Sequence, residues 1–327
     1  MPARILNGTL IAESIRHELT SEIAALASRG VVPGLAAVLV GEAPASQIYV
    51  RNKVKTSELL GLRSEKFELS ASTRTEELLK LVHDLNQRPE IDGILVQLPL
   101  PPQVDSRRVL LAIDPAKDVD GVHPLNAGKL MMGRPDIAPC TPAGIMEILD
   151  RCGIPLPGAR AVVIGRSDMV GKPVAMLLLH RSATVTICHS RTRELASVAS
   201  QADVLVVAVG QPALVNWNFI KQGATVIDVG INRLTRAEEV RAVFHEPLEA
   251  LEQLAAKGFI LVGDVQPEDV REKAGAYTPV PGGVGPLTIA MLMSNTVRAA
   301  RVRRGGGPDS RFTGAEAGCS TQGAAQV

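Results

Sequence analysis

Tyr49 and Lys53 are the first residues in the chain whose types and spacing could do chemistry together. They stand four residues apart in a segment expected to be helical, so their side chains should share one helix face. This segment follows the apolar run 35–40, and open α/β sheets bind ligands just beyond the ends of such strands. The pair is therefore a candidate for proton chemistry on a small molecule. The plain alternative is an aromatic and a cation on an exposed helix face.

Two further polar residues also stand at or beyond the end of an expected strand. Gln97 follows the apolar run 94–96, and a buried amide needs hydrogen-bond partners, so it is either a structural group or a ligand contact. Asp120 stands beside Gly121, where an aspartate could bind a ligand or form a turn. His123 has no partner at metal-ligand spacing. No metal site is predicted.

A glycine-containing loop follows the apolar run 161–164. Glycines at such a place let the backbone turn tightly and approach a pyrophosphate at the start of the next helix. The strict G-x-G-x-x-G pattern is absent, because Ser167 stands at the middle glycine position and Gly171 comes one position late. Taken alone, the loop fits a plain strand-to-helix turn equally well.

The end of the next expected strand favours NADP over NAD. A dinucleotide fold that uses NAD keeps an acidic residue there for the ribose 2′-hydroxyl. This chain has the segment 189–192 instead, with Ser190 and Arg191 and no carboxylate. A hydroxyl and a guanidinium suit a 2′-phosphate, and Arg166 could supply a second cation. The alternative is a solvated loop with an incidental arginine.

Composition excludes several other classes of protein. The chain has 327 residues, a formal net charge of +1 and 2% aromatic residues, which argues against nucleic-acid or anionic-membrane binding. Its four cysteines are widely spaced and suggest no zinc or disulfide framework, as in a reducing compartment. The first periodic segment is too charged for a secretory signal, and the apolar run 204–209 is only strand-sized. We expect a cytoplasmic enzyme or binding protein.

The N-terminal part alternates strands and helices, which predicts a parallel sheet. Strands are expected at 35–40, 65–69 and 93–102, and helices at 10–28, 46–60 and 76–85. The segment 114–139 is dense in Asp, Pro and Gly, and we expect an irregular, functional loop. A helix at 141–151 then leads to a domain boundary.

A second alternating series follows this boundary. Strands are expected at 161–164, 184–188, 204–209, 225–229 and 260–262, with helices near 172–182, 192–200 and 216–222. Residues 232–258 are expected to form an exposed helical excursion. Residues 278–286 must be irregular, and a final helix is expected at 287–302. The fold class is therefore α/β with two domains.

Several longer motifs occur in order along the chain. They are Tyr-Val-Arg-Asn-Lys at 49–53, Val-Gln-Leu-Pro-Leu-Pro at 96–101, Lys-Asp-Val-Asp-Gly at 117–121, Gly-Arg-Ser at 165–167 with Val-Gly-Lys-Pro at 170–173, and Thr-Pro-Val-Pro-Gly-Gly-Val-Gly-Pro-Leu-Thr at 278–288. Together they closely resemble the bifunctional methylenetetrahydrofolate dehydrogenase/methenyltetrahydrofolate cyclohydrolase family, and the resemblance runs from about residue 5 to residue 302.

The resemblance implies a domain organisation and two reactions. Residues 1–143 with 278–303 would form a folate-binding catalytic domain, and 144–277 an NADP-binding Rossmann domain. The last helix would return to the first domain, the protein would be a homodimer, and 304–327 would be a disordered tail. The first reaction would oxidise 5,10-methylenetetrahydrofolate with NADP⁺, and the second would hydrolyse the methenyl product to 10-formyltetrahydrofolate.

The resemblance also implies roles for the polar residues. Lys53 would be the key catalytic residue of the cyclohydrolase step, and Gln97 would orient it. Tyr49 would stack on the aminobenzoyl group, and Asp120 would accept hydrogen bonds from the pterin. The implied folate contacts are Tyr49, Lys53, Val96, Gln97, Leu98, Asp120, Pro281, Gly282, Gly283, Val284 and Gly285. The implied NADP contacts are Gly165, Arg166, Ser167, Ser190, Arg191 and Ile231.

Other interpretations fit the sequence less well. Short-chain dehydrogenases also use Tyr-x-x-x-Lys, but their glycine loop precedes that pair, whereas here it follows. A dehydrogenase with little cyclohydrolase activity, or a folate or nucleotide binder without turnover, would have no need of both Lys53 and Gln97. The chain departs from the family pattern at Asn7, Val122 and Leu125, and the stretch 232–258 looks longer than usual.

Overall fold

The strand β2 (Gly34–Val40) forms the centre of the N-terminal half in the computed structural model, which describes residues 3–305. It lies between β3 (Arg63–Leu69) and β4 (Gly93–Val96) in a three-stranded parallel sheet. Every residue of β2 is buried, because helices cover both faces of the sheet. Apolar side chains therefore pack to both sides of this strand.

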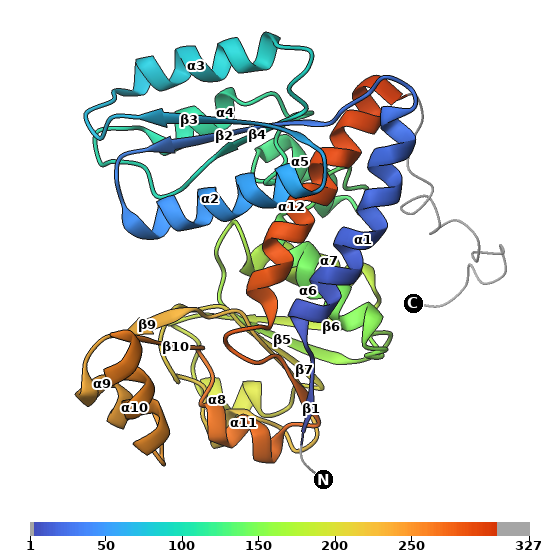
Figure 1. The fold of residues 1–327 in the computed structure, drawn as a ribbon. Coiled ribbons are helices and arrows are strands. Elements are labelled where there is room, and N and C mark those ends of the chain that lie inside the picture. The colour runs from blue at the N-terminus through green and yellow to red at the C-terminus, as the bar shows by residue number, and fades with distance from the viewer. Residues whose placement is uncertain (1–2, 306–327) are drawn as a thin grey trace, which may run out of the picture.

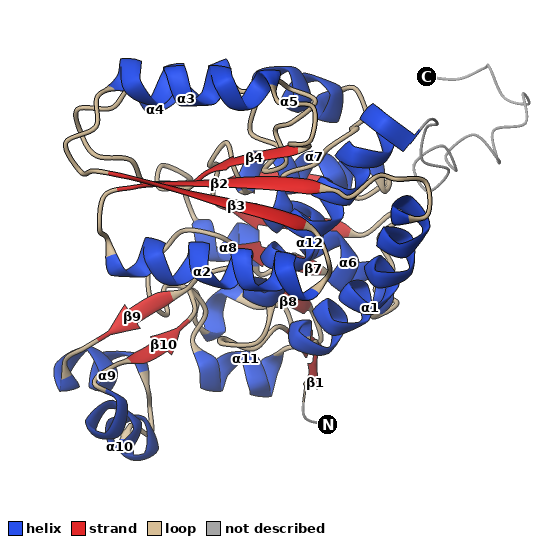
Figure 2. Cartoon of the chain, turned by 45° about the horizontal axis from the view of Figure 1, so that its top comes forward, coloured by secondary structure: helices blue, strands red, loops and turns tan. Residues whose placement is uncertain are grey.

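Three helices sandwich this sheet (Figure 2). One face carries α2 (Pro44–Leu59), and the other carries α3 (Thr75–Gln87) and α4 (Ser106–Ala112). The expected helices at 46–60 and 76–85 are confirmed, whereas α4 was not predicted. The strand expected over 93–102 is shorter than predicted and ends at Val96, since the prolines that follow cannot donate to a ladder.

The segment 114–139 is not irregular throughout, contrary to expectation. It contains the helix α5 (Pro124–Met131), which begins with a proline suited to the first helical turn. The imidazole Nδ1 of His123 caps this helix by accepting the Leu125 N–H at 3.1 Å. The helix α6 (Cys140–Arg151) follows, where one was expected.

Lys117 is the most deeply buried large side chain of this segment, with 1% of its surface exposed. Its ammonium donates to the main-chain carbonyls of Leu85 (3.0 Å), Asn86 (2.7 Å) and Arg88 (2.7 Å) at the end of α3. These are the carbonyls that a helix leaves without intrahelical partners. Lys117 therefore closes α3 and fixes the start of the loop that carries Asp120.

The C-terminal half is built on a six-stranded parallel sheet of order β1-β11-β8-β7-β5-β6. Its strands are β1 (Arg4–Ile5), β5 (Arg160–Ile164), β6 (Thr184–Cys188), β7 (Val204–Val207), β8 (Thr225–Asp228) and β11 (Ala276–Tyr277). One face carries α6 and α7 (Gly171–His180); the other carries α8 (Leu195–Ala199), α11 (Pro267–Lys273) and the short η1 (Trp217–Phe219) (Figure 1).

The residues 232–258 are mostly helical, as expected. They contain β9 (Asn232–Leu234), α9 (Ala237–Val243) and α10 (Leu248–Lys257), and β10 (Ile260–Val262) follows. The strand at 260–262 was expected in the parallel series, which is wrong: it pairs antiparallel with β9, apart from the main sheet. The chain doubles back after β8, so the two short strands meet each other.

The first and last helices join the two halves. The helix α12 (Val284–Ala300) packs on α1 (Gly8–Ala27) and α6, and also contacts α2 and β4 (Figure 1). This confirms that the last helix returns to the first half. The strand β1 lies within 1–143, yet it adds to the sheet of the second half. Two-residue strands such as β1 and β11 are too short to show a sequence period.

The described chain ends in a short basic π-helical turn, η2 (Arg301–Gly305). The carboxylate of Asp92 is fully buried before β4 and forms ion pairs with Arg303 and Arg304 of this turn. Arg304, which was expected to belong to a disordered tail, is therefore held in place; residues 306–327, the rest of that expected tail, lie outside the described residues. No helix among residues 3–305 is both long and apolar enough to span a membrane.

Candidate active site

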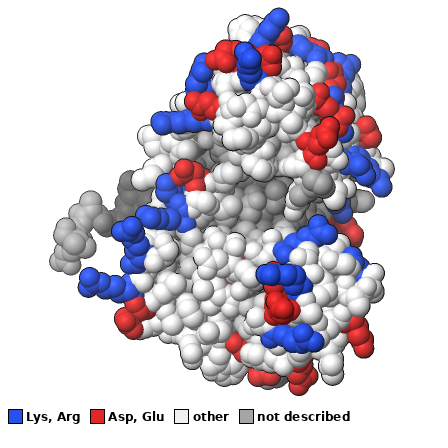
Figure 3. Space-filling view, turned by 90° about the vertical axis from the view of Figure 1, so that its left-hand side faces the viewer, with Lys and Arg blue, Asp and Glu red and all other residues white. Residues whose placement is uncertain are grey.

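A cavity of about 670 Å³ lies between the two halves of the molecule. On the face seen in Figure 3, the surface is hollowed between the upper and lower halves. Side chains of α2, the loop after β4 and the segment before α5 form one wall, and loops after β5 and β8 form another. The first turns of α12 complete it. The cavity therefore meets both sheets near the carboxyl ends of their strands, where α/β folds bind ligands.

Lys53 and Gln97 meet inside this cavity. The Lys53 Nζ donates to Gln97 Oε1 at 3.0 Å, and the Gln97 Nε2 donates to the Leu98 carbonyl at 2.7 Å. The second bond fixes which end of the amide faces the lysine. Lys53 is 8% exposed, whereas Tyr49, one helical turn earlier, is 45% exposed at the same cavity. The structure thus places an oriented ammonium beneath an accessible phenol ring.

Asp120 faces the same cavity from the loop before α5. Burial raises the pKa of Asp120, the Lys53 ammonium opposes this, and Asp118 adds to the rise. Burial also holds the pKa of the neighbouring Cys140 thiol well above its usual range, so this thiol stays protonated. In contrast to Asp120, Asp118 accepts the His123 N–H at 2.8 Å and so stabilises the loop. Of these two aspartates, Asp120 is therefore the one placed to contact a ligand.

The glycine loop after β5 is tightly packed. Gly165 has φ +125°, and a Cβ there would lie 2.2 Å from the Ala208 carbonyl oxygen. A Cβ on Gly171 would lie 2.2 Å from the Gly165 oxygen, so both positions exclude side chains. The Ser167 Oγ accepts the N–H groups of Val170 (3.2 Å) and Gly171 (3.3 Å) at the start of α7. A short backbone turn leading into a helix fits the pyrophosphate of a dinucleotide.

The turn after β6 presents cationic and hydroxyl groups. His189 N–H donates to Thr192 Oγ1 at 2.9 Å, and Arg191 N–H donates to the His189 imidazole at 3.2 Å, which fixes the turn. Arg166, Ser190 and Arg191 are exposed, and among residues 3–305 neither guanidinium has a carboxylate partner. This donor set fits a 2′-phosphate.

Not every expected contact residue lines the cavity. Val96, Leu98, Ile231, Val284 and Gly285 do so, together with the four polar residues described above. Three residues of the 278–286 loop do not, namely Pro281, Gly282 and Gly283; Pro281 lines a separate cavity. The cofactor candidates outside the cavity wall are Gly165, Arg166, Ser167, Ser190 and Arg191.

Sequence reasoning missed several cavity residues. Thr141 of α6 and Thr288 of α12 line the cavity, and their hydroxyl groups lie 3.1 Å apart. Thr141 directly precedes Pro142 and Thr288 follows Pro286 by two residues, both near expected helix starts, and this proximity was the available signal. Met169 and Val170 connect the glycine loop to the cavity, but their apolar side chains gave no chemical signal.

A lysine–amide pair and a dinucleotide-type loop bordering one cavity define a nucleotide-dependent α/β enzyme that acts on a small molecule. Residues 6–120 match "Tetrahydrofolate dehydrogenase/cyclohydrolase, catalytic domain", and residues 139–304 match the NAD(P)-binding domain of the same family. The chain belongs to the tetrahydrofolate dehydrogenase/cyclohydrolase family.

Individual members of the family match this chain along nearly their whole length. The "Bifunctional protein FolD" of Solibacter usitatus is 59% identical over 302 residues, which cover 92% of this chain and 99% of the relative. The crystal structure of the bifunctional FolD enzyme from Campylobacter jejuni has a TM-score of 0.84 and 41% identity, covering 92% of this chain and 99% of that one. The Trypanosoma brucei FolD structure, complexed with NADP cofactor and an inhibitor, has a TM-score of 0.83 and 40% identity, covering 92% and 98%.

Proposed function

We propose that the cavity between the two halves is the folate site of this enzyme, with Lys53, Gln97 and Asp120 as its working groups. The enzyme is an NADP-dependent methylenetetrahydrofolate dehydrogenase and methenyltetrahydrofolate cyclohydrolase, as its family membership and relatives support. It oxidises 5,10-methylenetetrahydrofolate to the methenyl cation and hydrolyses that cation to 10-formyltetrahydrofolate.

The observation that carries the proposed site is the hydrogen bond of 3.0 Å between Lys53 and Gln97 in a cavity that Met169, Val170 and Ile231 also line. These three residues belong to the loops after β5 and β8, where a dinucleotide fold holds its cofactor. Substrate chemistry and cofactor binding can therefore share one space.

The dehydrogenase step needs positioning more than acid or base groups. NADP⁺, when bound, supplies the hydride acceptor. We assign its pyrophosphate to the loop of Gly165, Arg166 and Ser167, and its 2′-phosphate to Ser190 and Arg191, with Ile231 as an apolar contact. The protein contributes by holding the folate carbon and the cofactor at one fixed approach, which can lower a barrier by several kcal/mol.

The cyclohydrolase step needs a group that moves protons. Water adds to the methenyl carbon and releases one proton to solvent; the hydroxyl of this adduct then loses its proton as the C=O forms, and the ring nitrogen gains one as the C–N bond opens. Lys53 lies at the cavity and can carry this proton from oxygen to nitrogen. Gln97 keeps the Lys53 Nζ in one position, because its own amide is fixed by the Leu98 carbonyl. Gln97 is thus a positioning residue.

The remaining contacts would hold the folate. Asp120 would accept hydrogen bonds from the pterin amino group and ring N–H, and Tyr49 would stack on the aminobenzoyl ring. Val96, Leu98 and the segment 281–285 would form apolar and backbone walls. We further propose a catalytic domain of 1–143 with 278–303, a nucleotide domain of 144–277, a homodimer and a cytoplasmic location.

A paired assay tests this function. Purified protein receives methylenetetrahydrofolate with NADP⁺ or with NAD⁺, and the appearance of reduced cofactor is followed; methenyltetrahydrofolate decay is measured separately. We expect faster reduction of NADP⁺ and methenyl decay well above the spontaneous rate. Absence of signal with both cofactors would refute the dehydrogenase, and decay at the spontaneous rate would leave a dehydrogenase alone.

A further inference from the structure

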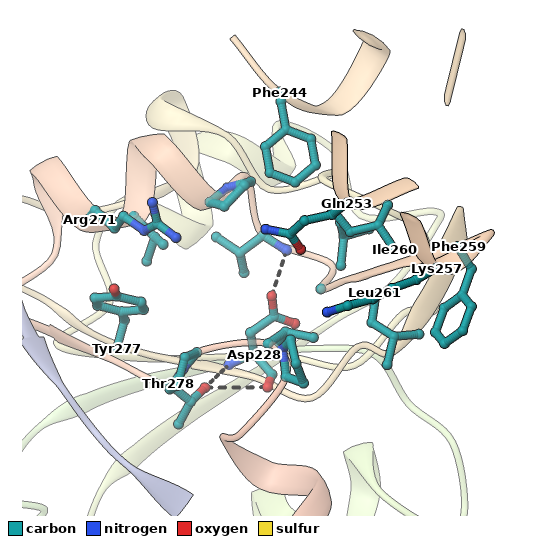
Figure 4. A pocket seen from close by; sticks show the side chains of 18 residues that line it. Asp228, Phe244, Gln253, Lys257, Phe259, Ile260, Leu261, Arg271, Tyr277 and Thr278 are labelled. Atoms are coloured by element: carbon teal, nitrogen blue, oxygen red, sulfur yellow. Dashed lines mark hydrogen bonds between the residues drawn. The ribbon is translucent and has the colours of Figure 1, made fainter. Parts of the chain in front are cut away.

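A second cavity, of about 370 Å³, lies in the C-terminal half and shares no lining residue with the first. It lies between α10 with β10 on one side and α11 with β11 on the other, and residues 279–281 border it (Figure 4). Part of its wall belongs to the stretch 232–258. The catalytic steps above make no use of this cavity.

The cavity gathers aromatic side chains in a chain that has few of them. Phe244, Phe259 and Tyr277 line it, whereas the whole protein has five phenylalanines and two tyrosines. Ile260 and Val270 add apolar surface. Figure 4 shows the Tyr277 ring and the Phe244 ring at different edges of the same space. Such walls suit a planar apolar group.

Two cations also line this cavity, and neither is neutralised. Lys257 ends α10, Arg271 lies on α11, and among residues 3–305 neither has a carboxylate within ion-pair distance. Figure 4 shows them on opposite sides, with both side chains directed toward the cavity. By contrast, Lys221 and Arg236 of the same half are paired with Asp203 and Glu239. The cavity therefore favours an anion.

Asp228 limits how much negative charge the cavity can accept. Its buried carboxylate accepts the N–H groups of Gly230, Asp264 and Val265, each at 2.9 Å, and lies at the inner end of the cavity. Burial raises its pKa to about 7, although these three N–H groups oppose the rise. A monoanion with its charge near the two cations meets less repulsion from Asp228 than a dianionic phosphate would.

We propose that this second cavity binds a small aromatic carboxylate, with the carboxylate placed between Lys257 and Arg271 and the ring packed against the aromatic wall of the cavity. The volume suits a ligand of one or two fused rings rather than a nucleotide. Arginine and lysine both form charge-assisted hydrogen bonds with carboxylates, which are stronger than neutral ones.

The second cavity shares a chain segment with the active site. Pro279 and Pro281 border the second cavity, and Val284 and Gly285, a few residues later, line the folate cavity. A ligand that fixes residues 279–281 should therefore alter the position of the first turn of α12. We expect its binding to change the KM for methylenetetrahydrofolate without competing for the folate site.

Calorimetric titration of the full-length protein with 2-naphthoate tests the proposal, and 2-naphthamide is the neutral control. The titration is repeated with saturating folate and NADP⁺, which separates the two cavities. We expect binding of the naphthoate at one site under both conditions and no binding of the amide. Lys257→Gln and Arg271→Gln should each weaken binding roughly tenfold, while Lys80→Gln, on the distant α3, should leave it unchanged.

Three results would overturn the proposal: no binding to the wild type, equal affinity in the wild type and both cavity variants, or loss of binding when folate and NADP⁺ are present. Lys257 and Arg271 are exposed, so their glutamine variants should keep the wild-type Tm, which is measured alongside. Binding is read without turnover, so the result is independent of the function proposed above.

Discussion

Two lysines of the N-terminal half are buried to a similar degree but held in opposite ways. Lys53 is 8% exposed and has one hydrogen-bond partner among residues 3–305, the side chain of Gln97. Lys117 is 1% exposed and uses its three donors on three main-chain carbonyls. An ammonium with donors left over beside a cavity can act on a ligand, whereas a saturated one can only hold the fold.

The electrostatics of Lys117 support this contrast. Burial lowers the pKa of Lys117 to about 8, and the charge of Arg303 adds to the lowering. The three carbonyls favour the charged form, so burial outweighs them. The buried charge is costly, but without it the Asn86 carbonyl would have no hydrogen-bond partner among residues 3–305, and the Leu85 and Arg88 carbonyls would each keep only one main-chain N–H.

The largest expected effect is the loss of hydrolysis in Lys53→Met. Because general acid–base groups contribute about 10²- to 10⁴-fold, methenyl decay above the spontaneous rate should fall by that factor. The Tm should change little, since Met fills similar space and only the amide of Gln97 loses a partner. Hydrolysis at the wild-type rate would show that Lys53, like Lys117, has no catalytic role.

The same substitution at Lys117 should give the reverse pattern. Lys117→Met removes three charge-assisted hydrogen bonds at the end of α3 and leaves the Asn86 carbonyl without a partner among residues 3–305, and we expect the free energy of unfolding to fall by about 2–3 kcal/mol. Denaturant unfolding measures this loss, and both activities of the folded protein should stay within a few-fold of wild type. A large loss of activity with unchanged stability would contradict the structural role.

The pH dependence of stability tests the lowered pKa of Lys117, and here we expect a smaller effect whose direction is predicted. Its pKa is about 8 in the folded state against the ordinary 10.5, so between these values the unfolded chain binds more protons. Lys117 therefore makes stability rise with pH across this window, by roughly 1–3 kcal/mol. The difference in unfolding free energy between wild type and Lys117→Met should show this slope. A pH-independent difference would contradict the lowered pKa.

The smallest expected effect links Lys53 to Asp120. Burial raises the pKa of Asp120 and the Lys53 ammonium opposes this, so Lys53→Met should raise it further. A protonated Asp120 cannot accept two hydrogen bonds from the pterin, so the KM for methylenetetrahydrofolate should rise as the pH falls through this pKa. In Lys53→Met the rise should begin at higher pH. Asp120→Asn is the control, and its KM should show no such rise at low pH.

The sequence could reveal the fold class and the polar residues because both depend on local patterns. Strands such as 161–164 and helices such as 76–85 show their apolar period directly, and the Tyr49–Lys53 spacing follows from the helix alone. The roles within Lys117–Asp120 could not be separated in this way. Neighbouring residues of that motif point into a helix end, a loop and a cavity, and only the tertiary contacts distinguish them.

Other features depend on partners that are distant in sequence. The strand β1 has two residues and is defined only by its pairing with β11. The residues 260–262 have a strand-like composition, but nothing local says that they pair with β9 rather than with the parallel sheet. The second cavity is likewise not predictable from the sequence, since Phe244 follows α9, Lys257 ends α10 and Tyr277 lies in β11.

The ion pairs of Asp92 set an order of events during synthesis. The ribosome adds Arg303 to the chain 211 residues after Asp92, which at ordinary translation rates is a delay on the order of 10 to 40 seconds. Until then the N-terminal sheet holds a carboxylate whose partners have not been made. Nascent chains stalled before Arg303 should be cleaved by protease in this sheet more readily than chains released after it. The N-terminal half can therefore complete its folding only after the last described residues have been translated.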